Sequence, residues 1–157
     1  MTNPARAQSQ LLGVFNEELA LKMAEVLGML GCGHALVVHG EDGMDEITLG
    51  GKTTVCELKN GAVSRYHIDP EDFGFKRTGI DKLRGGSPKE NSDILRCVLH
   101  GEKGAYRDIT LLNAAAALVA ADQAKDLKEG VKLAAASIDS FAAMKKLDGL
   151  KELTQSL

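Results

Sequence analysis

The order of hydrophobic and polar positions divides the chain into a strand-rich first half and a helical second half. Residues 35–39 form an apolar run of strand length without polar alternation, which is typical of a strand buried on both faces of a parallel or mixed sheet. Before it, apolar side chains recur at helical spacing from residue 19 to residue 30. This spacing predicts a helix that Asn16 caps and that two glycines end. The first 15 residues show no clear period.

A β-hairpin is predicted in the middle of the chain. The dipeptide Asn60-Gly61 lies between two strand-like segments, residues 54–58 and 63–68. It is the dipeptide best suited to a two-residue turn, because both turn positions need a positive φ. Residues 47–49 suggest a further short strand ahead of the hairpin, and residues 69–86 have the composition of a long loop.

The chain from residue 87 onward is predicted to be helical. Residues 87–90 and 126–129 have the pattern of capping boxes, and residues 111–121 are apolar on nearly every side, which is typical of a central helix. The expected N-caps are Ser87, Asp108, Asp126 and Ser140. Together these elements predict the α/β class, with a mixed, mostly parallel sheet, an antiparallel hairpin and a C-terminal set of helices.

Composition and charge narrow the class of protein. The 157 residues, 44% of them hydrophobic and 26% charged, suit one soluble domain. A net charge of −3 leaves no general basic surface, so nucleic acid is not the expected partner. The longest apolar stretch is well short of the ~20 residues that span a bilayer, so no membrane association is expected. The three cysteines form no Cys-x-x-Cys pair, which favours a reduced compartment, and the cytoplasm is the expected location.

One acidic loop carries candidate chemistry. Asp42, Asp45 and Glu46 lie within five residues, directly after the buried run, beside two glycines that allow sharp turns. In open α/β sheets ligands bind outside the carboxyl ends of the strands, and adjacent carboxylates suit a hard cation such as Mg²⁺. The alternative is a solvated acidic turn, which the residue types alone favour.

A second cluster, residues 83–91, offers a weaker candidate. Two glycines before a helix N-terminus, with Arg84 and Lys89 nearby, are able to hold a phosphate. The capping box at Ser87 and Glu90 would already occupy those amide groups, so a structural loop is the favoured interpretation. None of the four histidines has a second ligand at metal-binding spacing, and a structural or solvent-facing role is expected for each.

The order of several short segments is recognisable as a whole. These segments are residues 3–6 (NPAR), 13–15 (GVF), 35–40 (ALVVHG), 42–46 (DGMDE), 71–74 (EDFG), 83–86 (LRGG), 90–91 (EN) and 111–118 (LLNAAAAL). With these segments the chain closely resembles anthranilate phosphoribosyltransferase from residue 2 to about residue 150. Their agreement in order and spacing is more specific than any single motif.

The resemblance implies an activity and a metal. The family transfers the phosphoribosyl group of phosphoribosyl pyrophosphate to the amino group of anthranilate in tryptophan biosynthesis, releases pyrophosphate, and uses Mg²⁺. Its Asp-Glu metal motif falls on Asp45 and Glu46, which makes the metal interpretation of the acidic loop the favoured one. The resemblance assigns no ligand role to Asp42, and it transfers no catalytic or cofactor-binding residue to this chain.

The resemblance also implies a particular domain organisation. Residues 1–157 correspond to the C-terminal portion of the family's α/β domain, and the family's N-terminal helical domain and glycine-rich pyrophosphate loop have no counterpart in this sequence. The chain is therefore expected to be an incomplete, inactive fragment or one half of a split enzyme that needs a separate N-terminal half. Two alternatives stay open: a non-enzymatic binding or scaffold module, and a relative of pyrimidine-nucleoside phosphorylase.

Overall fold

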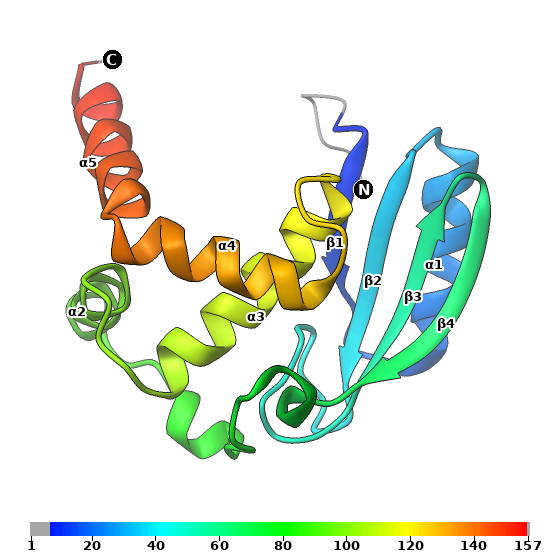
Figure 1. Ribbon diagram of the computed structural model, residues 1–157, viewed down its shortest axis with the longest axis horizontal. Helices are drawn as coiled ribbons and strands as arrows, with labels where there is room; N and C mark the ends of the chain where they lie inside the picture. The colour runs from blue at the N-terminus through cyan, green and yellow to red at the C-terminus, as the bar shows by residue number, and fades with distance from the viewer. Residues whose placement is uncertain (1–6, 157) are drawn as a thin grey trace.

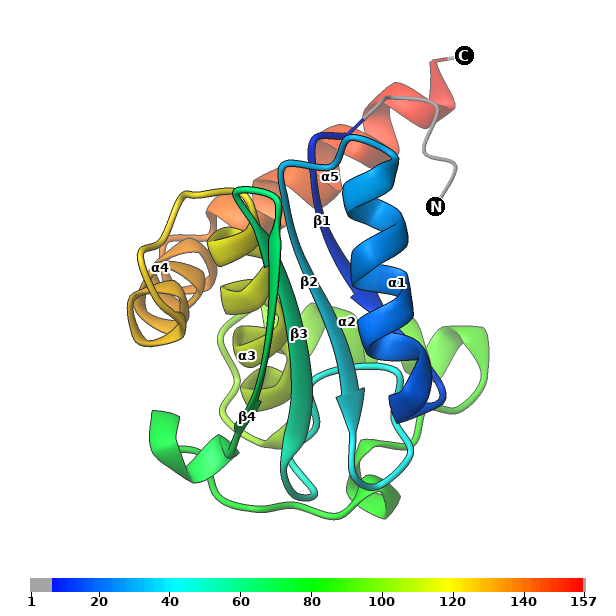
Figure 2. The same ribbon diagram turned by 90° about the vertical axis from the view of Figure 1, so that its right-hand side faces the viewer.

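The computed structural model describes residues 7–156, so the segment at residues 3–6 lies outside the described residues. A four-stranded sheet has helices on both faces, α1 on one face and α3 on the other (Figures 1 and 2). The helices α2 and α5 lie farther from the sheet (Figure 1). The strands are β1 (Ser9–Gly13), β2 (His34–Gly40), β3 (Thr53–Lys59) and β4 (Ala62–Ile68). The helices are α1 (Glu17–Met29), α2 (Pro88–Leu99), α3 (Ala105–Ala120), α4 (Leu127–Asp139) and α5 (Ala142–Gln155), with short 3-10 helices η1 (Pro70–Phe73) and η2 (Ile80–Leu83).

The sheet is mixed and has the order β1-β2-β3-β4. The α/β class, the antiparallel hairpin and the C-terminal helices are confirmed, but the proportion of parallel pairing differs from the expectation. Only β1 and β2 are parallel, whereas β2–β3 and β3–β4 are antiparallel. A parallel pair needs a crossover, which α1 supplies between β1 and β2. The loop at residues 41–52 contains no helix and the turn at Asn60-Gly61 is tight, so both later strands return antiparallel.

The strand β2 is buried on both faces, as the apolar run predicts. Ala35 and Val37 belong to the core cluster that α1 shares with the sheet, and Leu36 and Val38 belong to the cluster beneath α3. The partners from α1 include Ala20, Ala24 and Leu27, and those from α3 include Leu112, Ala115 and Ala116. Successive strand side chains point to opposite faces, so an unbroken apolar run places one core on each side of β2.

The predicted central helix is α3, which packs against the sheet on one side and α4 on the other (Figure 1). Its buried side chains contribute to the core beneath the sheet and to the core among the C-terminal helices. Among the described residues, neither α3 nor any other helix has the length and apolar character needed to cross a membrane.

The helix starts are confirmed where a side chain caps them. Asn16 accepts a hydrogen bond from the Glu18 amide, and Ser87 takes part in a full capping box. Asp126 caps α4 by accepting from the Glu129 amide, although the Glu129 carboxylate accepts from Lys125 and not from Asp126.

Two predicted caps are wrong. Gly104, not Asp108, precedes α3, and its φ of 146° is a conformation that favours glycine, so the helix starts a turn earlier than expected. Ser140 is the C-cap of α4, and α5 begins after Phe141.

Residues 47–49 do not form the predicted strand. The segment is buried, but two of its amide groups bond to side chains instead of to a neighbouring strand: Ile47 donates to Asn113 and Thr48 donates to Thr53. The first strand, β1, was not predicted, because its five residues have no period of their own and become a strand by pairing with β2.

The helices α3 and α4 pack with almost no space between their backbones. A Cβ atom on Gly130 would lie 2.8 Å from the carbonyl oxygen of Ala115. We expect Gly130→Ala to lower the free energy of unfolding by about 1–3 kcal/mol, the usual cost of overpacking. Gly149→Ala in α5 is the matched control, since a Cβ there meets nothing within 4 Å, and it should stabilise by up to ~1 kcal/mol. Urea unfolding measures the free energy of unfolding of both variants. Equal changes in the two variants would contradict the close packing of α3 and α4.

Candidate metal site

The candidate site lies where β1 and β2 end side by side. Because these strands are parallel, with Gly13 opposite Val38, their carboxyl ends share one edge of the sheet. The acidic loop starts at this edge, directly after β2. A cavity of about 280 Å³ there is lined by Leu11, Gly13, Val38, Asp45, Glu46 and Asn113. The two predicted metal ligands therefore line one cavity, together with Gly13 and Asn113, which sequence reasoning did not select.

Gly13 lies in direct contact with the backbone of the acidic loop. A Cβ atom built on Gly13 would be 1.5 Å from the Asp45 carbonyl oxygen and 2.5 Å from its carbonyl carbon. No side chain fits in that space, so the end of β1 sets the position of Asp45. A glycine is required at position 13 because two backbones approach closely there, and not because of an unusual φ.

Asn113 holds the other end of the acidic pair. Its Nδ2 donates to the Ile47 carbonyl oxygen at 2.8 Å, and its Oδ1 accepts from the Ile47 amide at 2.9 Å. The same Nδ2 also donates to the carbonyl oxygen of Ile109 within α3 at 3.1 Å. The residue that follows Glu46 is thus attached to α3 through both of its backbone polar groups.

Asp42 has a structural role inside the loop. Its Oδ2 accepts a 2.5 Å hydrogen bond from the Thr48 hydroxyl, and its Oδ1 accepts from the Met44 amide at 3.3 Å. The Thr48 hydroxyl oxygen in turn accepts from the Gly50 amide at 2.8 Å. Both Asp42 oxygens therefore hold the loop in shape.

The carboxylates of Asp45 and Glu46 are exposed and available. Within residues 7–156 neither carboxylate accepts a hydrogen bond or forms an ion pair, and no group of three or more His, Cys, Asp or Glu side chains is arranged to hold a metal. A pair of hard oxygen donors is the set that Mg²⁺ takes when water and substrate phosphate complete its coordination. The donor chemistry at this cavity therefore fits Mg²⁺.

The cluster at residues 83–91 is a capped helix start. The Ser87 amide donates to the Glu90 carboxylate at 2.7 Å, and the Glu90 amide donates to the Ser87 hydroxyl at 3.4 Å. The Gly86 amide donates to Asn91 at 2.7 Å. The hydrogen bond from Ser87 lowers the pKa of Glu90, which keeps the cap charged. These amides are occupied, so the structural interpretation is supported over phosphate binding.

The buried histidine His34 also has a structural setting. Its Nε2 lies 2.9 Å from Glu57 and its Nδ1 lies 3.0 Å from Asp122. The Tyr66 hydroxyl donates to the second Glu57 oxygen, and burial raises the pKa of Tyr66. Hydrogen bonds from Lys59 and His34 lower the pKa of Asp122. This network joins three strands to the end of α3, and none of its residues lines the cavity beside Asp45 and Glu46.

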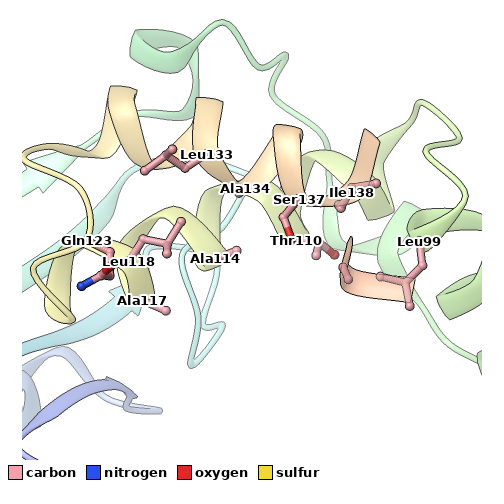
Figure 3. Close-up of a pocket in the computed structure, with 11 residues that line it drawn as sticks. Leu99, Thr110, Ala114, Ala117, Leu118, Gln123, Leu133, Ala134, Ser137 and Ile138 are labelled. Carbon is pink, nitrogen blue, oxygen red and sulfur yellow. The ribbon is translucent and has the colours of Figure 1, made fainter. Parts of the chain in front are cut away.

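A larger groove of about 660 Å³ lies among the C-terminal helices. Figure 3 shows Leu133, Ala134, Ser137 and Ile138 of α4 opposite Ala114, Ala117 and Leu118 of α3. Its remaining lining residues are Leu99, Thr110, Gln123 and Ala143. None of these side chains is charged, so the groove offers no carboxylate to a cation.

Comparison with known families defines the class of protein. Residues 1–144 match the model of a glycosyl transferase family, specifically its a/b domain. Since the match covers most of the sequence, the chain belongs to this family.

The relatives within the family are anthranilate phosphoribosyltransferases. The enzyme of Symbiobacterium thermophilum is 51% identical over 157 residues, which is 100% of this chain and 46% of that enzyme. The enzyme of Thermomicrobium roseum is 52% identical over 160 residues, again covering 46% of its length. The chain spans just under half the length of these relatives and corresponds to their C-terminal part.

Solved structures of the same enzyme share the fold. The Thermus thermophilus enzyme has 40% sequence identity and a TM-score of 0.78, covering 87% of this chain and 40% of that chain. The Saccharomyces cerevisiae enzyme in complex with phosphoribosyl pyrophosphate and Mg has 29% identity and a TM-score of 0.85, covering 95% of this chain and 43% of that chain. The resemblance inferred from short segments is thus confirmed at the level of the family.

Proposed function

We propose that this chain forms the metal-binding part of an anthranilate phosphoribosyltransferase, an enzyme of tryptophan biosynthesis. The observation that carries the proposal is that two exposed carboxylates, Asp45 and Glu46, line one cavity at the carboxyl ends of β1 and β2. The identity of 51% to the Symbiobacterium thermophilum enzyme supports the reaction. The Saccharomyces cerevisiae complexes with phosphoribosyl pyrophosphate, Mg and 4-fluoroanthranilate support the substrates and the metal.

In this reaction the bond between ribose C1 and the pyrophosphate oxygen breaks, and a bond from C1 to the anthranilate nitrogen forms. The electron pair leaves with pyrophosphate, and the amine loses a proton. Asp45 and Glu46 would hold Mg²⁺, which supplies positive charge beside the departing pyrophosphate. Asp42, Gly13 and Asn113 hold the backbone that carries the two carboxylates before substrate arrives, so less ordering is needed during the reaction.

We propose further that residues 1–157 act as the C-terminal portion of the α/β phosphoribosyltransferase domain, in the cytoplasm. A separate N-terminal half would supply the groups that hold the rest of the substrates. Two surfaces support a partner of this kind. Among the described residues β1 pairs with β2 alone, which leaves its outer edge open, and the groove beside α4 is apolar. The three cysteines are free, which agrees with a reduced compartment.

Complementation tests the proposed function. The 157-residue chain is assayed for anthranilate consumption with phosphoribosyl pyrophosphate and Mg²⁺, alone and with the part of the Symbiobacterium thermophilum enzyme that it does not match. We expect no measurable rate alone, because few of the aligning groups are present, and a restored rate in the mixture. A rate for the chain alone close to that of the intact relative would contradict the proposal.

Two further outcomes of the same assay would favour the alternatives. Phosphorolysis of a pyrimidine nucleoside by the mixture, without transfer to anthranilate, would favour a nucleoside phosphorylase relative. Stable association of the two polypeptides with no reaction on either substrate pair would favour a scaffold module.

A further inference from the structure

We propose that Asn113 is a positioning residue of the metal site, which fixes the Asp45-Glu46 pair by holding Ile47 to helix α3. The inference rests on the proposed function, because it concerns the same two carboxylates. Asn113 lies 66 residues from Ile47 in sequence, so the contact is purely tertiary. The residue touches neither carboxylate in a hydrogen bond and acts through the backbone beside them.

The hydrogen bonds of Asn113 are concentrated on one residue. Its Nδ2 and Oδ1 bond to the carbonyl oxygen and the amide of Ile47 at 2.8 and 2.9 Å. The Ile47 side chain is only 1% exposed and belongs to the core cluster beneath the sheet. The backbone that leaves Glu46 is therefore held at three points: two hydrogen bonds to α3 and one buried side chain.

The Asn113 side chain is itself held in one orientation. The second Nδ2 proton is directed to the Ile109 carbonyl oxygen, one turn earlier in α3, at 3.1 Å. The preceding residue, Leu112, is fully buried, so this face of α3 is anchored in the core. On the opposite side of the loop, Gly13 leaves no room for Asp45 to move toward β1. The acidic pair is thus confined between β1 and α3.

This arrangement has a consequence for metal affinity. Exposed carboxylates on a mobile loop lose both backbone and side-chain freedom when they bind a cation, whereas on a loop that is already fixed the backbone part of this cost is smaller. Outer partners that orient metal ligands typically change metal affinity by about 10–100-fold when they are removed. Asn113 also lines the same cavity as Asp45 and Glu46, so its effect should fall on this site and not only on the core.

The test measures binding of Mn²⁺ alone to the 157-residue chain, through loss of the free-ion electron paramagnetic resonance signal. Mn²⁺ stands in for Mg²⁺ because it uses the same oxygen ligands. We expect Asn113→Ala to weaken Mn²⁺ binding by about 10-fold or more, with the same number of sites at saturation. Thr110→Val is the matched control: Thr110 lies on the same helix, and its hydroxyl donates to the Tyr106 carbonyl oxygen within that helix.

The outcomes separate this inference from the proposed function. If the double variant Asp45→Asn, Glu46→Gln loses Mn²⁺ binding and Asn113→Ala does not weaken it relative to Thr110→Val, the positioning role is wrong and the metal site stands. If the double variant binds Mn²⁺ as the unchanged chain does, the metal site itself is wrong. Urea unfolding of the same proteins supplies the structural readout. A purely structural Asn113 would lower the free energy of unfolding and leave the Mn²⁺ dissociation constant unchanged, which also overturns the proposal.

Discussion

Replacing Asp45 with Asn and Glu46 with Gln is expected to reduce the Mg²⁺-dependent transferase activity of the complemented enzyme by about 100-fold or more. Both substitutions keep the size of the side chain and remove the negative charge that a hard cation requires. The backbone of the loop should stay in place, since Asp42, Asn113 and Gly13 hold it without using either carboxylate. The double variant should therefore have a lower transferase rate and need a higher Mg²⁺ concentration. Its free energy of unfolding should change little.

Steady-state assays over a range of Mg²⁺ concentrations measure this effect. Glu41→Gln is the matched control, because Glu41 is an exposed carboxylate of the same loop that packs against Gly51 and does not line the cavity. It removes charge from the loop and should leave the rate within a few-fold of the unchanged protein. An equal loss in Glu41→Gln would show that the overall charge of the loop matters and would contradict a specific role for the pair.

The second large effect is expected from Gly13→Ala. The added Cβ would lie 1.5 Å from the Asp45 carbonyl oxygen, so either β1 or the acidic loop must move. We expect the free energy of unfolding to fall by about 1–3 kcal/mol, as for other overpacked positions, and Mn²⁺ binding to weaken because the pair is displaced. The substitution changes no charge and no hydrogen-bonding side chain, so the effect is purely one of position.

Gly33→Ala supplies the comparison at the other end of the β1–β2 pair. A Cβ there would lie 3.7 Å from the Gln8 carbonyl oxygen, an ordinary contact. Urea unfolding and Mn²⁺ titration of the two variants are compared directly. If Gly13→Ala binds Mn²⁺ as well as Gly33→Ala does, the position of Asp45 is not set by β1.

Local signals made much of the fold predictable. The burial of β2 follows from its unbroken apolar run, and the hairpin follows from Asn60-Gly61, whose φ values of 52° and 77° are those the turn requires. Asn16 and Ser87 mark helix starts because a capping side chain bonds to amides within its own turn. Each of these features depends on residues a few positions apart.

The parts that were missed depend on distant partners. The strand β1 exists because β2 pairs with it, and residues 47–49 stay irregular because side chains of other elements accept from the amides of Ile47 and Thr48. Gly104 precedes α3 in a backbone conformation with a positive φ. A glycine permits this conformation, but its presence in the sequence does not predict it. The proportion of parallel pairing depends on which connections contain a helix, and the loop at residues 41–52 does not.

The residues of the candidate site fall into the same two groups: those that the sequence indicates, and those that only the fold brings to the site. Asp45 and Glu46 were selected through the family resemblance, since the residue types of the acidic loop alone favoured a solvated turn. Gly13 and Asn113 come from β1 and α3, and only the fold brings them to the same cavity. One signal was present for Asn113: it is the polar residue inside an otherwise apolar stretch, residues 111–121, and a polar group in such a helix needs a partner.

The most direct test of the central claim is the position of the metal. Crystals of the complemented enzyme with phosphoribosyl pyrophosphate and Mn²⁺ would be measured by anomalous diffraction at the manganese edge. We predict an anomalous peak at coordination distance, about 2.1 Å, from at least one carboxylate oxygen of Asp45 or Glu46. The assignment of these residues as the metal ligands would be contradicted by a peak found only beside the pyrophosphate, if every oxygen of both carboxylates lies more than about twice the coordination distance from the manganese.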